Sequence, residues 1–516
     1  MVDRKNLLNM ATIALLLLAF GALAAHSFWR AASIYDEGFA LTNALRIMRG
    51  DSAFLDFWSV YPPGTSYLLA IFFSIFEASI EVSRVVHIAW ICLIIAFSHR
   101  LINVSTSLTM SHIASLIIAA WIFLTLIPSY SMGPALALAL ISLHLFIRGY
   151  KAQKSAWIAV AALIGGLIIF FRHDIAGYLF ISFLTCYGML SFRALSSVSS
   201  TNRGLLLHYL LIYLITTFSV LGIIISQSGA ESFIDQALRF PAFIQREQRF
   251  LPFPQFLSFW NESIDVGRWL LAWFTPVVLT LFAAFLLVLR KHISELSVVI
   301  ITITWTMTLL LLFQAFGRLD LVHAAPSMVF LVVMTFSAVG SVSHSANSVT
   351  RLFLVIMLCA TTIYSLADTA RALGINTILG CSLGAGCSRM PLDQSAVVDY
   401  VNQEFGPDEP IFVGNWRHDR IHINDALLYF RLNRPIPTKW SEMHPGEVTT
   451  VSVQTEMVEQ LEEENVSVVI LVNLRSGFEP NESAISSEAF VLDTYLQRKF
   501  SPSWRRGGYT VMLRNP

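Results

Sequence analysis

Residues 33–40 of the chain read SIYDEGFA and follow its first long apolar run, residues 7–28. Two adjacent carboxylates, Asp36 and Glu37, therefore stand where the chain would leave a membrane. Charged groups beside a membrane are costly and tend to serve binding or chemistry. What this pair does depends on which other polar groups share its side of the membrane, so we first place the membrane spans.

The composition indicates a polytopic membrane protein. Of its 516 residues, 55% are hydrophobic and only 13% are charged, whereas ordinary soluble domains are about 25% charged. The formal net charge is zero, so the chain has no overall attraction to nucleic acid and we expect no nucleic-acid partner.

A membrane helix needs about 20 mostly apolar residues. We predict about eleven transmembrane helices, at residues 7–28, 82–99, 109–128, 132–148, 156–171, 175–192, 205–227, 269–289, 295–316, 323–341 and 350–367. The first run also resembles a signal peptide with an A-x-A site. A retained span is favoured there, because the rest of the chain is itself a membrane bundle.

The apolar stretch 64–77 is too short to be a confident span, and its placement decides the topology. If it does not cross, every short basic loop lies on the same side as the N-terminus, as the positive-inside rule requires. If it crosses, the rule fails at nearly every later loop. We therefore predict one outer loop, 29–81, with interfacial helices, and a second outer loop at 228–268. The N-terminus would be cytoplasmic, and the chain would lie in a bacterial inner membrane.

The last third of the chain changes character. We predict a membrane domain over residues 1–368 and an extracytoplasmic α/β domain over 369–516, because charge, Pro and Gly become frequent. The segments EPIFVGN, VSVVILVN and YTVMLRN are typical of short buried strands, and residues 391–405, 424–433, 450–465 and 482–499 of amphipathic helices. Cys381 and Cys387 favour a local disulfide over free thiols, which requires an oxidising compartment.

Three further polar clusters lie on the outer side in this topology, together with the acidic pair. They are Arg84, the FRHD segment with Arg172, His173 and Asp174, and the GRLDLVH segment with Arg318, Asp320 and His323. An Arg guanidinium keeps its charge and can bind two phosphate oxygens at once, and a His can donate to the same oxygens. The alternatives are that Arg84 is an interfacial anchor and that the other arginines pair with the neighbouring aspartates.

Asp36 has two interpretations. Ser33-x-x-Asp36 loosely resembles a capping box at the start of a helix, whereas a functional Asp36 would be a general base. Adjacent residues on a helix point about 100° apart, so one acid would act as base and Glu37 would bind or orient. Asp56, Tyr61, Asp174 and Asp320 are candidate wall or acceptor-contact residues. The loop 228–268, with Arg239, Arg246 and Arg249, is either a lid over a lipid chain or an interfacial connector.

One acid facing several cations favours group transfer from a phosphate-bearing donor. A phosphate leaves without a protonating acid, so one carboxylate base suffices and cations stabilise the departing charge. A transporter or flippase of lipid-linked sugars is the main alternative, although such proteins usually show internal repeats and broken mid-membrane helices, which the sequence lacks. An oligosaccharide ligase without base chemistry at Asp36 is a further alternative.

The first outer loop resembles that of the C-type integral-membrane glycosyltransferases. The shared pattern is the acidic pair, a G-D-x-x-F-x-D stretch at 50–56, a Y-P-P-G turn at 61–64 and an arginine opening the next span. The branch that it resembles most is that of the protein O-mannosyltransferases and the lipid A aminoarabinose transferase. The segments GGLIIFFRHDIAGYL and GRLDLVHAAPS also resemble stretches of bacterial members.

The resemblance implies an inverting hexosyl- or pentosyltransferase that uses a polyprenyl-phosphate sugar on the outer face of the membrane, with a glycan, lipid or protein acceptor. Asp36 would activate the acceptor, and Glu37 would bind acceptor or a divalent cation, the one cofactor that the resemblance suggests. The lipid phosphate would be bound by Arg84, Arg172, Arg318 and His323. The outer loops of the membrane portion hold no Lys, unlike the aminoarabinose branch, which argues against that sugar.

Overall fold

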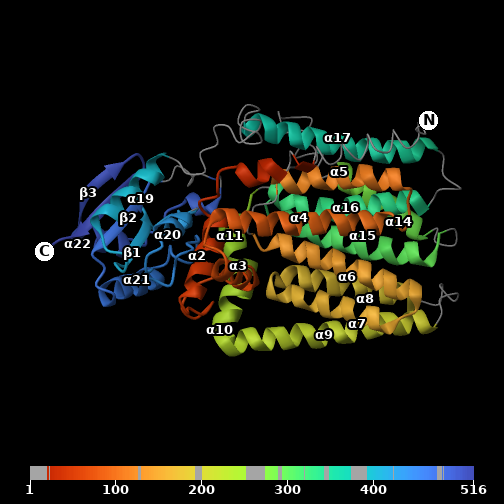
Figure 1. Cartoon of the computed structure of the whole chain (residues 1–516), viewed down its shortest axis with the longest axis horizontal. Coiled ribbons are helices and arrows are strands. Elements are labelled where there is room, and N and C mark those ends of the chain that lie inside the picture. Colours follow the sequence, from red (N-terminus) through yellow and green to blue (C-terminus); the bar gives the residue numbers. More distant parts are fainter. Residues whose placement is uncertain are drawn as a thin grey trace.

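The fold is an elongated helical bundle with a small α/β domain at one end (Figure 1). It was obtained as a computed structural model that describes residues 20–21, 24–125, 130–191, 200–251, 274–288, 293–318, 320–341, 348–373, 392–421, 423–473, 479 and 481–516. The predicted first span, 7–28, lies largely outside these residues, and the predicted disulfide Cys381–Cys387 lies outside them entirely.

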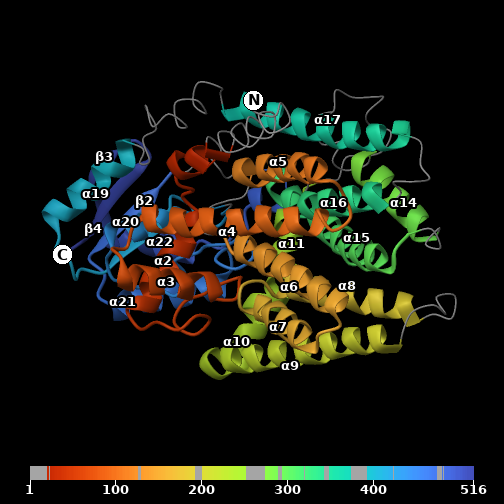
Figure 2. The ribbon, with the colours of Figure 1, turned by 45° about the vertical axis from the view of Figure 1, so that its right-hand side comes forward.

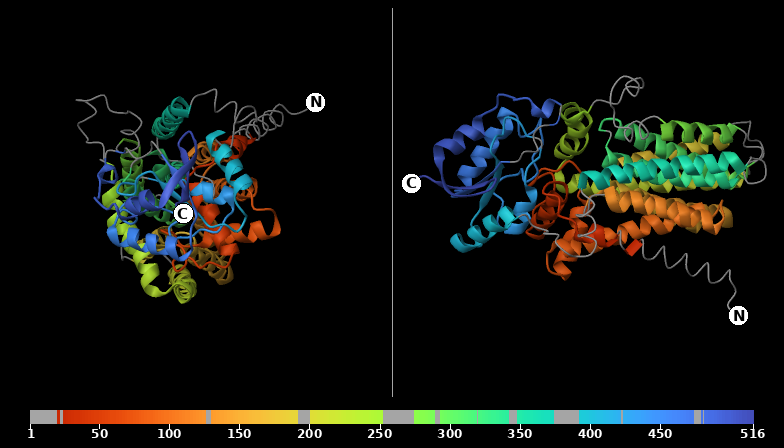
Figure 3. Two further views of the ribbon diagram at one scale, coloured as in Figure 1. Left: turned by 90° about the vertical axis from the view of Figure 1, so that its left-hand side faces the viewer. Right: turned by 90° about the horizontal axis from the view of Figure 1, so that it is seen from above.

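Long apolar helices run side by side through the bundle (Figures 1 and 3). Every predicted span from 82–99 to 350–367 coincides with a helix, and six of the described helices are long and apolar enough to cross a membrane. These six are α4 (Ile80–Ile102), α6 (Met132–Ala152), α8 (His173–Ser191), α9 (Ser200–Ser228), α15 (Glu295–Ala315) and α16 (Leu321–Ser341). The other helices of the bundle are α5 (Leu108–Thr125), α7 (Ser155–Gly166) with the 3-10 turn η1 (Leu167–Phe170), α14 (Thr275–Val288) and α17 (Ser348–Leu373).

Helix α16 forms the centre of the bundle. All of its side chains from Ala324 to Val339 are buried, and it packs against α15, α5, α14 and α4. Several hydroxyl groups on these helices bond to their own helix: the Thr304 hydroxyl donates to the Ile300 carbonyl at 2.7 Å, and the Thr335 hydroxyl donates to the Leu331 carbonyl at 2.7 Å. The packing of α16 against four neighbouring helices therefore fixes the helix ends from which the loops of the site begin.

A layer of short helices lies between the bundle and the α/β domain (Figure 2). Helix α3 has 12 residues and is about 18 Å long, shorter than an apolar layer of about 30 Å; the prediction that 64–77 does not cross stays a prediction. A Cβ on Gly64 would lie 2.4 Å from the Phe170 carbonyl oxygen, so only glycine allows this contact. The layer comprises α2 (Asp36–Met48), α3 (Gly64–Ile75), α10 (Ala230–Phe233), the π-helix η3 (Ile234–Ile244) and α11 (Gln245–Arg249).

The C-terminal domain is built on a four-stranded sheet of order β1-β2-β4-β3. β1 (Ile411–Asn415) and β2 (Val468–Val472) are parallel, whereas β4 (Tyr509–Arg514) is antiparallel to β2 and to β3 (Phe500–Arg506). The three predicted strands are confirmed, but β3 was not predicted, because it is an edge strand whose side chains are mostly exposed. The helices are α19 (Leu392–Glu404), α20 (Ala426–Leu432), α21 (Val451–Glu463) and α22 (Val491–Lys499), which begins nine residues after the predicted 482.

Close contacts dock this domain onto α2, beside which α20 lies in Figure 1. The amide of Leu427 donates to the Ile34 carbonyl at 2.9 Å, and the Thr42 hydroxyl donates to the Ala426 carbonyl at 2.9 Å. A Cβ on Gly38 would lie 2.4 Å from the Leu427 nitrogen, so glycine is needed where α2 meets α20. The first outer loop and the C-terminal domain therefore form one packed unit at this end of the bundle.

Candidate active site

Asp36 is the first residue of α2, and its carboxylate takes no part in capping that helix. The Ser33 hydroxyl accepts from the Asp36 amide at 3.1 Å, and the Ser33 amide donates to Glu37 Oε2 at 3.2 Å. Glu37, and not Asp36, is thus the acid that completes the predicted cap. Among the residues that the structure describes, no side chain donates a hydrogen bond to the Asp36 carboxylate.

The charges of three basic side chains from distant parts of the sequence act on Asp36. Burial raises the pKa of Asp36, and the charges of Arg249, His323 and Arg318 oppose that shift without cancelling it. The Leu251 amide donates to the Gly317 carbonyl at 3.1 Å and thereby ties the end of α11 to the loop before α16. The charges of Arg318 and His323 therefore act on Asp36 in the fold, and the roles predicted for these three residues stay predictions.

Glu37 and Arg84 form a fully buried ion pair. Arg84 donates from Nε to Glu37 Oε1 at 2.5 Å and from Nη2 to Oε2 at 2.7 Å, and its Nη1 donates to the Ser27 carbonyl at 2.5 Å. Their side chains are 0% and 1% exposed. The contacts favour a structural link between α2 and α4, and the catalytic and phosphate-binding roles predicted for the two residues stay predictions.

A divalent cation beside Glu37 does not fit this arrangement. Both Glu37 oxygens already accept hydrogen bonds, from Arg84 and from the Ser33 amide. No group of three or more His, Cys, Asp or Glu side chains suited to a metal occurs within the described part of the chain. We therefore derive no step through a metal ion.

The FRHD segment contributes a second buried network. Arg172, 4% exposed, donates to Asp174 at 2.9 and 2.5 Å and to the Tyr130 hydroxyl at 3.1 Å. Its guanidinium lies 4.6 Å from the centre of the Tyr61 ring, and the Tyr61 and Tyr130 hydroxyls are 2.6 Å apart. Gln314 donates to the same Asp174 carboxylate at 2.6 Å. Arg172 therefore pairs with Asp174, which is the alternative to phosphate binding that the sequence had left open.

The remaining predicted residues differ in their surroundings. Neighbouring His173, the first residue of α8, has an Nδ1 that is buried without a partner among the described residues. Asp56 is exposed, and its carboxylate accepts a hydrogen bond from the Ser52 amide at 2.7 Å, so it stabilises a turn.

Arg318 pairs with the C-terminal domain. Its Nη1 donates to Glu479 Oε2 at 2.6 Å, its Nη2 also bonds that carboxylate, and its Nε lies 3.4 Å from Asp320 Oδ2. Asp320 accepts from the amide and the Nδ1 of His323 at 2.9 and 2.8 Å. Burial would raise the pKa of Asp320, but the His323 hydrogen bonds and the Arg318 charge hold it below its usual range. Asp320 therefore orients both Arg318 and His323, the candidate phosphate ligands of this segment.

Sequence reasoning missed four residues that lie at this site. Arg249 was predicted only as part of a lid, yet within the described residues its Nε is buried without a hydrogen-bond partner. Tyr35, Glu442 and His444 meet where the C-terminal domain contacts the start of α2. The one signal in the sequence is KWSEMHPG at 439–446, where a carboxylate and an imidazole stand two residues apart before a Pro-Gly turn.

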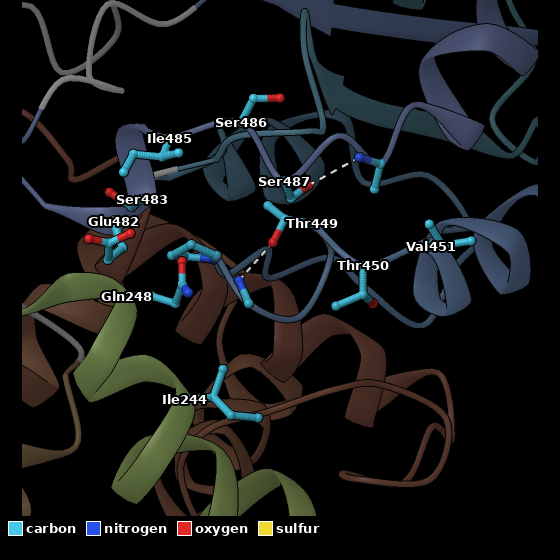
Figure 4. Close-up of a pocket in the computed structure, with 13 residues that line it drawn as sticks. Ile244, Gln248, Thr449, Thr450, Val451, Glu482, Ser483, Ile485, Ser486 and Ser487 are labelled. Atoms are coloured by element: carbon cyan, nitrogen blue, oxygen red, sulfur yellow. Dashed lines mark hydrogen bonds between the residues drawn. The ribbon is translucent and has the colours of Figure 1, made fainter.

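A cavity of about 520 Å³ lies along the same contact between the membrane portion and the C-terminal domain (Figure 4). Gln248 and Ile244 line one side, and hydroxyl groups of Thr449, Thr450 and Ser487 line the other. A polar ligand could hydrogen bond along this hydroxyl-rich wall.

The whole chain resembles solved membrane enzymes in structure. ArnT from Cupriavidus metallidurans, bound to undecaprenyl phosphate, superposes with a TM-score of 0.60 at 12% identity, over 99% of this chain and 98% of that one. The archaeal oligosaccharyltransferase AglB from Archaeoglobus fulgidus, in complex with an inhibitory peptide and a dolichol-phosphate, gives a TM-score of 0.54 at 13% identity, over 98% and 74%.

No family model and no curated protein sequence matches the chain. The likeness is therefore one of architecture, and it extends from the helical bundle through the C-terminal domain. The chain has the fold of the C-type integral-membrane glycosyltransferases, the family that its first outer loop resembles.

Proposed function

We propose that the protein is an inverting glycosyltransferase that moves a sugar from a polyprenyl-phosphate donor to an acceptor at the outer face of the membrane. The observation that carries the proposal is that the charges of Arg249, His323 and Arg318 act on the carboxylate of Asp36. An available carboxylate beside several cations suits proton removal from an acceptor next to a departing phosphate. The whole-chain likeness to a structure bound to undecaprenyl phosphate supports the donor class.

In the proposed step, ionised Asp36 takes the proton of an acceptor hydroxyl as that oxygen attacks the anomeric carbon. The bond from this carbon to the phosphate oxygen breaks, and its electron pair leaves with the polyprenyl phosphate. Attack opposite to the leaving group inverts the anomeric centre. Arg249, Arg318 and His323 would balance the charge that develops on the phosphate.

Two buried ion pairs would hold this arrangement in place without taking part in the chemistry. Glu37 and Arg84 fix the first turn of α2 against α4. Arg172 and Asp174 fix the tyrosines Tyr61 and Tyr130, which would form a wall of the donor site. Preorganised groups of this kind keep the reacting atoms within the narrow geometry that transfer needs.

Substitution of Asp36 tests the proposal. The Asp36→Asn variant keeps the shape and the helix start but cannot accept a proton, so transfer should fall by at least about 100-fold. The assay is release of free polyprenyl phosphate from a labelled lipid-sugar pool, with mass spectrometry of the product. Full activity of Asp36→Asn would remove Asp36 from the role of base.

A transporter or a ligase is the second candidate, and the same assay separates them. A flippase would move the lipid-linked sugar without releasing polyprenyl phosphate, and a ligase would not depend on Asp36. For location, we propose a bacterial inner-membrane protein whose C-terminal domain faces the periplasm. Protection of that domain from protease added outside spheroplasts would contradict this orientation.

A further inference from the structure

Glu442 is a buried carboxyl group with no role in the proposed step, and only one of its two oxygens has a hydrogen-bond partner among the described residues. Its residue is 0% exposed. One oxygen, Oε1, lies 2.7 Å from His444 Nε2, whereas Oε2 is buried without a hydrogen-bond partner among the described residues. Leaving such an oxygen unsatisfied costs free energy, so a ligand that hydrogen bonds it would remove a penalty already present in the fold.

His444 holds Glu442 in a fixed orientation. The Tyr35 hydroxyl lies 2.8 Å from His444 Nε2 and 3.0 Å from its Nδ1. The rings of Trp58 and Phe240 pack on the imidazole, with centroid distances of 4.9 and 5.5 Å. Tyr35 directly precedes Asp36 in the chain. The first outer loop, η3 and the C-terminal domain therefore converge on the imidazole that orients Glu442.

Glu442 and Asp36 act on each other through charge. Burial raises the pKa of Glu442 well above its usual range, the charge of Asp36 raises it further, and Arg249 opposes the shift. The raised pKa favours the neutral form of the Glu442 carboxyl group. A neutral carboxyl group can both donate and accept a hydrogen bond, so Glu442 suits a hydroxyl group of an acceptor.

The surroundings indicate an acceptor with several hydroxyl groups. His444 is followed by Pro445 and Gly446, which line the cavity of Figure 4. A Cβ on Gly446 would lie 2.4 Å from the Ile244 side chain, so this turn packs directly on η3. One segment thus carries Glu442 at its inner end and the hydroxyl-lined wall, with Thr449, at its outer end.

We propose that Glu442 is an acceptor-binding residue, which hydrogen bonds a hydroxyl next to the one that Asp36 deprotonates, and that the acceptor is a saccharide. This inference rests on the proposed glycosyl transfer and names its acceptor class. Neighbouring hydroxyls are present on a saccharide, whereas the side chain of serine or threonine has one hydroxyl, and the oxygens of a phosphate monoester are acidic groups on one phosphorus and not neighbouring alcohols.

The experiment compares Glu442→Met with Glu442→Gln in the purified full-length protein. Methionine fits the buried site without an unsatisfied polar group, whereas glutamine keeps a neutral donor and acceptor. Glu447→Met is the matched control, because Glu447 lies in the same segment and bonds Trp440 at 3.4 Å without any interaction with Asp36. A lipid extract supplies the donor, and the saccharide fraction of envelopes from cells lacking the gene is titrated as acceptor.

We expect Glu442→Met to raise the half-saturating acceptor concentration on the order of tenfold. Glu442→Gln and Glu447→Met should stay near wild type, and all variants should bind undecaprenyl phosphate equally by native mass spectrometry. Wild-type acceptor dependence of Glu442→Met, or loss of function in Glu442→Gln to the same extent, would overturn the role of Glu442. A product mass located on a peptide or a lipid phosphate would overturn the saccharide class. If the wild type releases no polyprenyl phosphate, the proposed function itself fails.

Discussion

Substitutions of Glu37 and Arg84 can show whether this ion pair serves stability or donor binding. Their side chains are 0% and 1% exposed, and two hydrogen bonds of 2.5 and 2.7 Å join them. Removing one partner of such a pair leaves an uncompensated buried charge and costs about 3–5 kcal/mol. We therefore expect Arg84→Met and Glu37→Leu each to destabilise the protein by that amount, and the double variant to be more stable than either single one.

Denaturant unfolding of the purified protein in detergent measures these differences, and the polyprenyl phosphate assay gives the donor KM of each variant that remains folded. The double variant should keep a donor KM near wild type if the pair only holds α2 against α4. A raised donor KM in Arg84→Met, with its stability unchanged, would refute this reasoning. It would restore Arg84 to the phosphate-binding role predicted from the sequence.

Three further predictions concern the groups around Asp36. Arg249→Ala should raise the donor KM about tenfold or more, whereas Arg246→Ala, exposed on the same helix, should leave it unchanged in the same assay. Activity should fall as pH drops through the pKa of Asp36; because burial raises that pKa, the acidic limb of the pH–rate profile should lie above that of an ordinary carboxyl, and Arg249→Ala should move it higher still. Glu479→Gln should release Arg318 from its ion pair and lower the donor KM severalfold, and an unchanged KM would show that Arg318 does not bind the donor.

Much of the fold followed from hydrophobic run length and from the distribution of basic loops. The run at 64–77 was separated from the spans by its length, and the structure has there the 12-residue helix α3, which packs in the layer beside α2. β3 could not be predicted from its own sequence. An edge strand with mostly exposed side chains lacks the alternation that marks a half-buried strand, and only its pairing with β4 defines it.

The site was predictable to the level of which loops meet, and not to the level of which side chains pair. Asp36 and Arg318 could be placed on one side from topology alone, because basic loops fix the other side. The pairing of Arg84 with Glu37 depends on the relative rotation of α2 and α4, which hydropathy does not encode. Glu442 lies more than 400 residues from Asp36 in a separate domain, so the docking of that domain, rather than any motif, brings it to the site.

Four of the arginines at this end of the molecule, Arg84, Arg172, Arg249 and Arg318, differ in how readily each could bind a phosphate. Arg84 and Arg172 are almost fully buried with their carboxylates, and a phosphate that displaced Glu37 or Asp174 would strand a buried negative charge, at a cost of several kcal/mol. The Arg318–Glu479 pair is 21% and 22% exposed, so its carboxylate can move into water when a phosphate replaces it, and such partly exposed pairs are weak.

Arg249 could bind a phosphate without giving up a carboxylate partner, because no ion pair within the described residues engages its guanidinium. Burial and pairing therefore rank Arg249 first, Arg318 second, and Arg172 and Arg84 last as ligands for the donor phosphate. The order is checked by the donor KM of the four single Met substitutions, each normalised to its folded fraction. Equal effects at Arg249 and Arg84 would show that pairing in this arrangement does not decide which cations the phosphate uses.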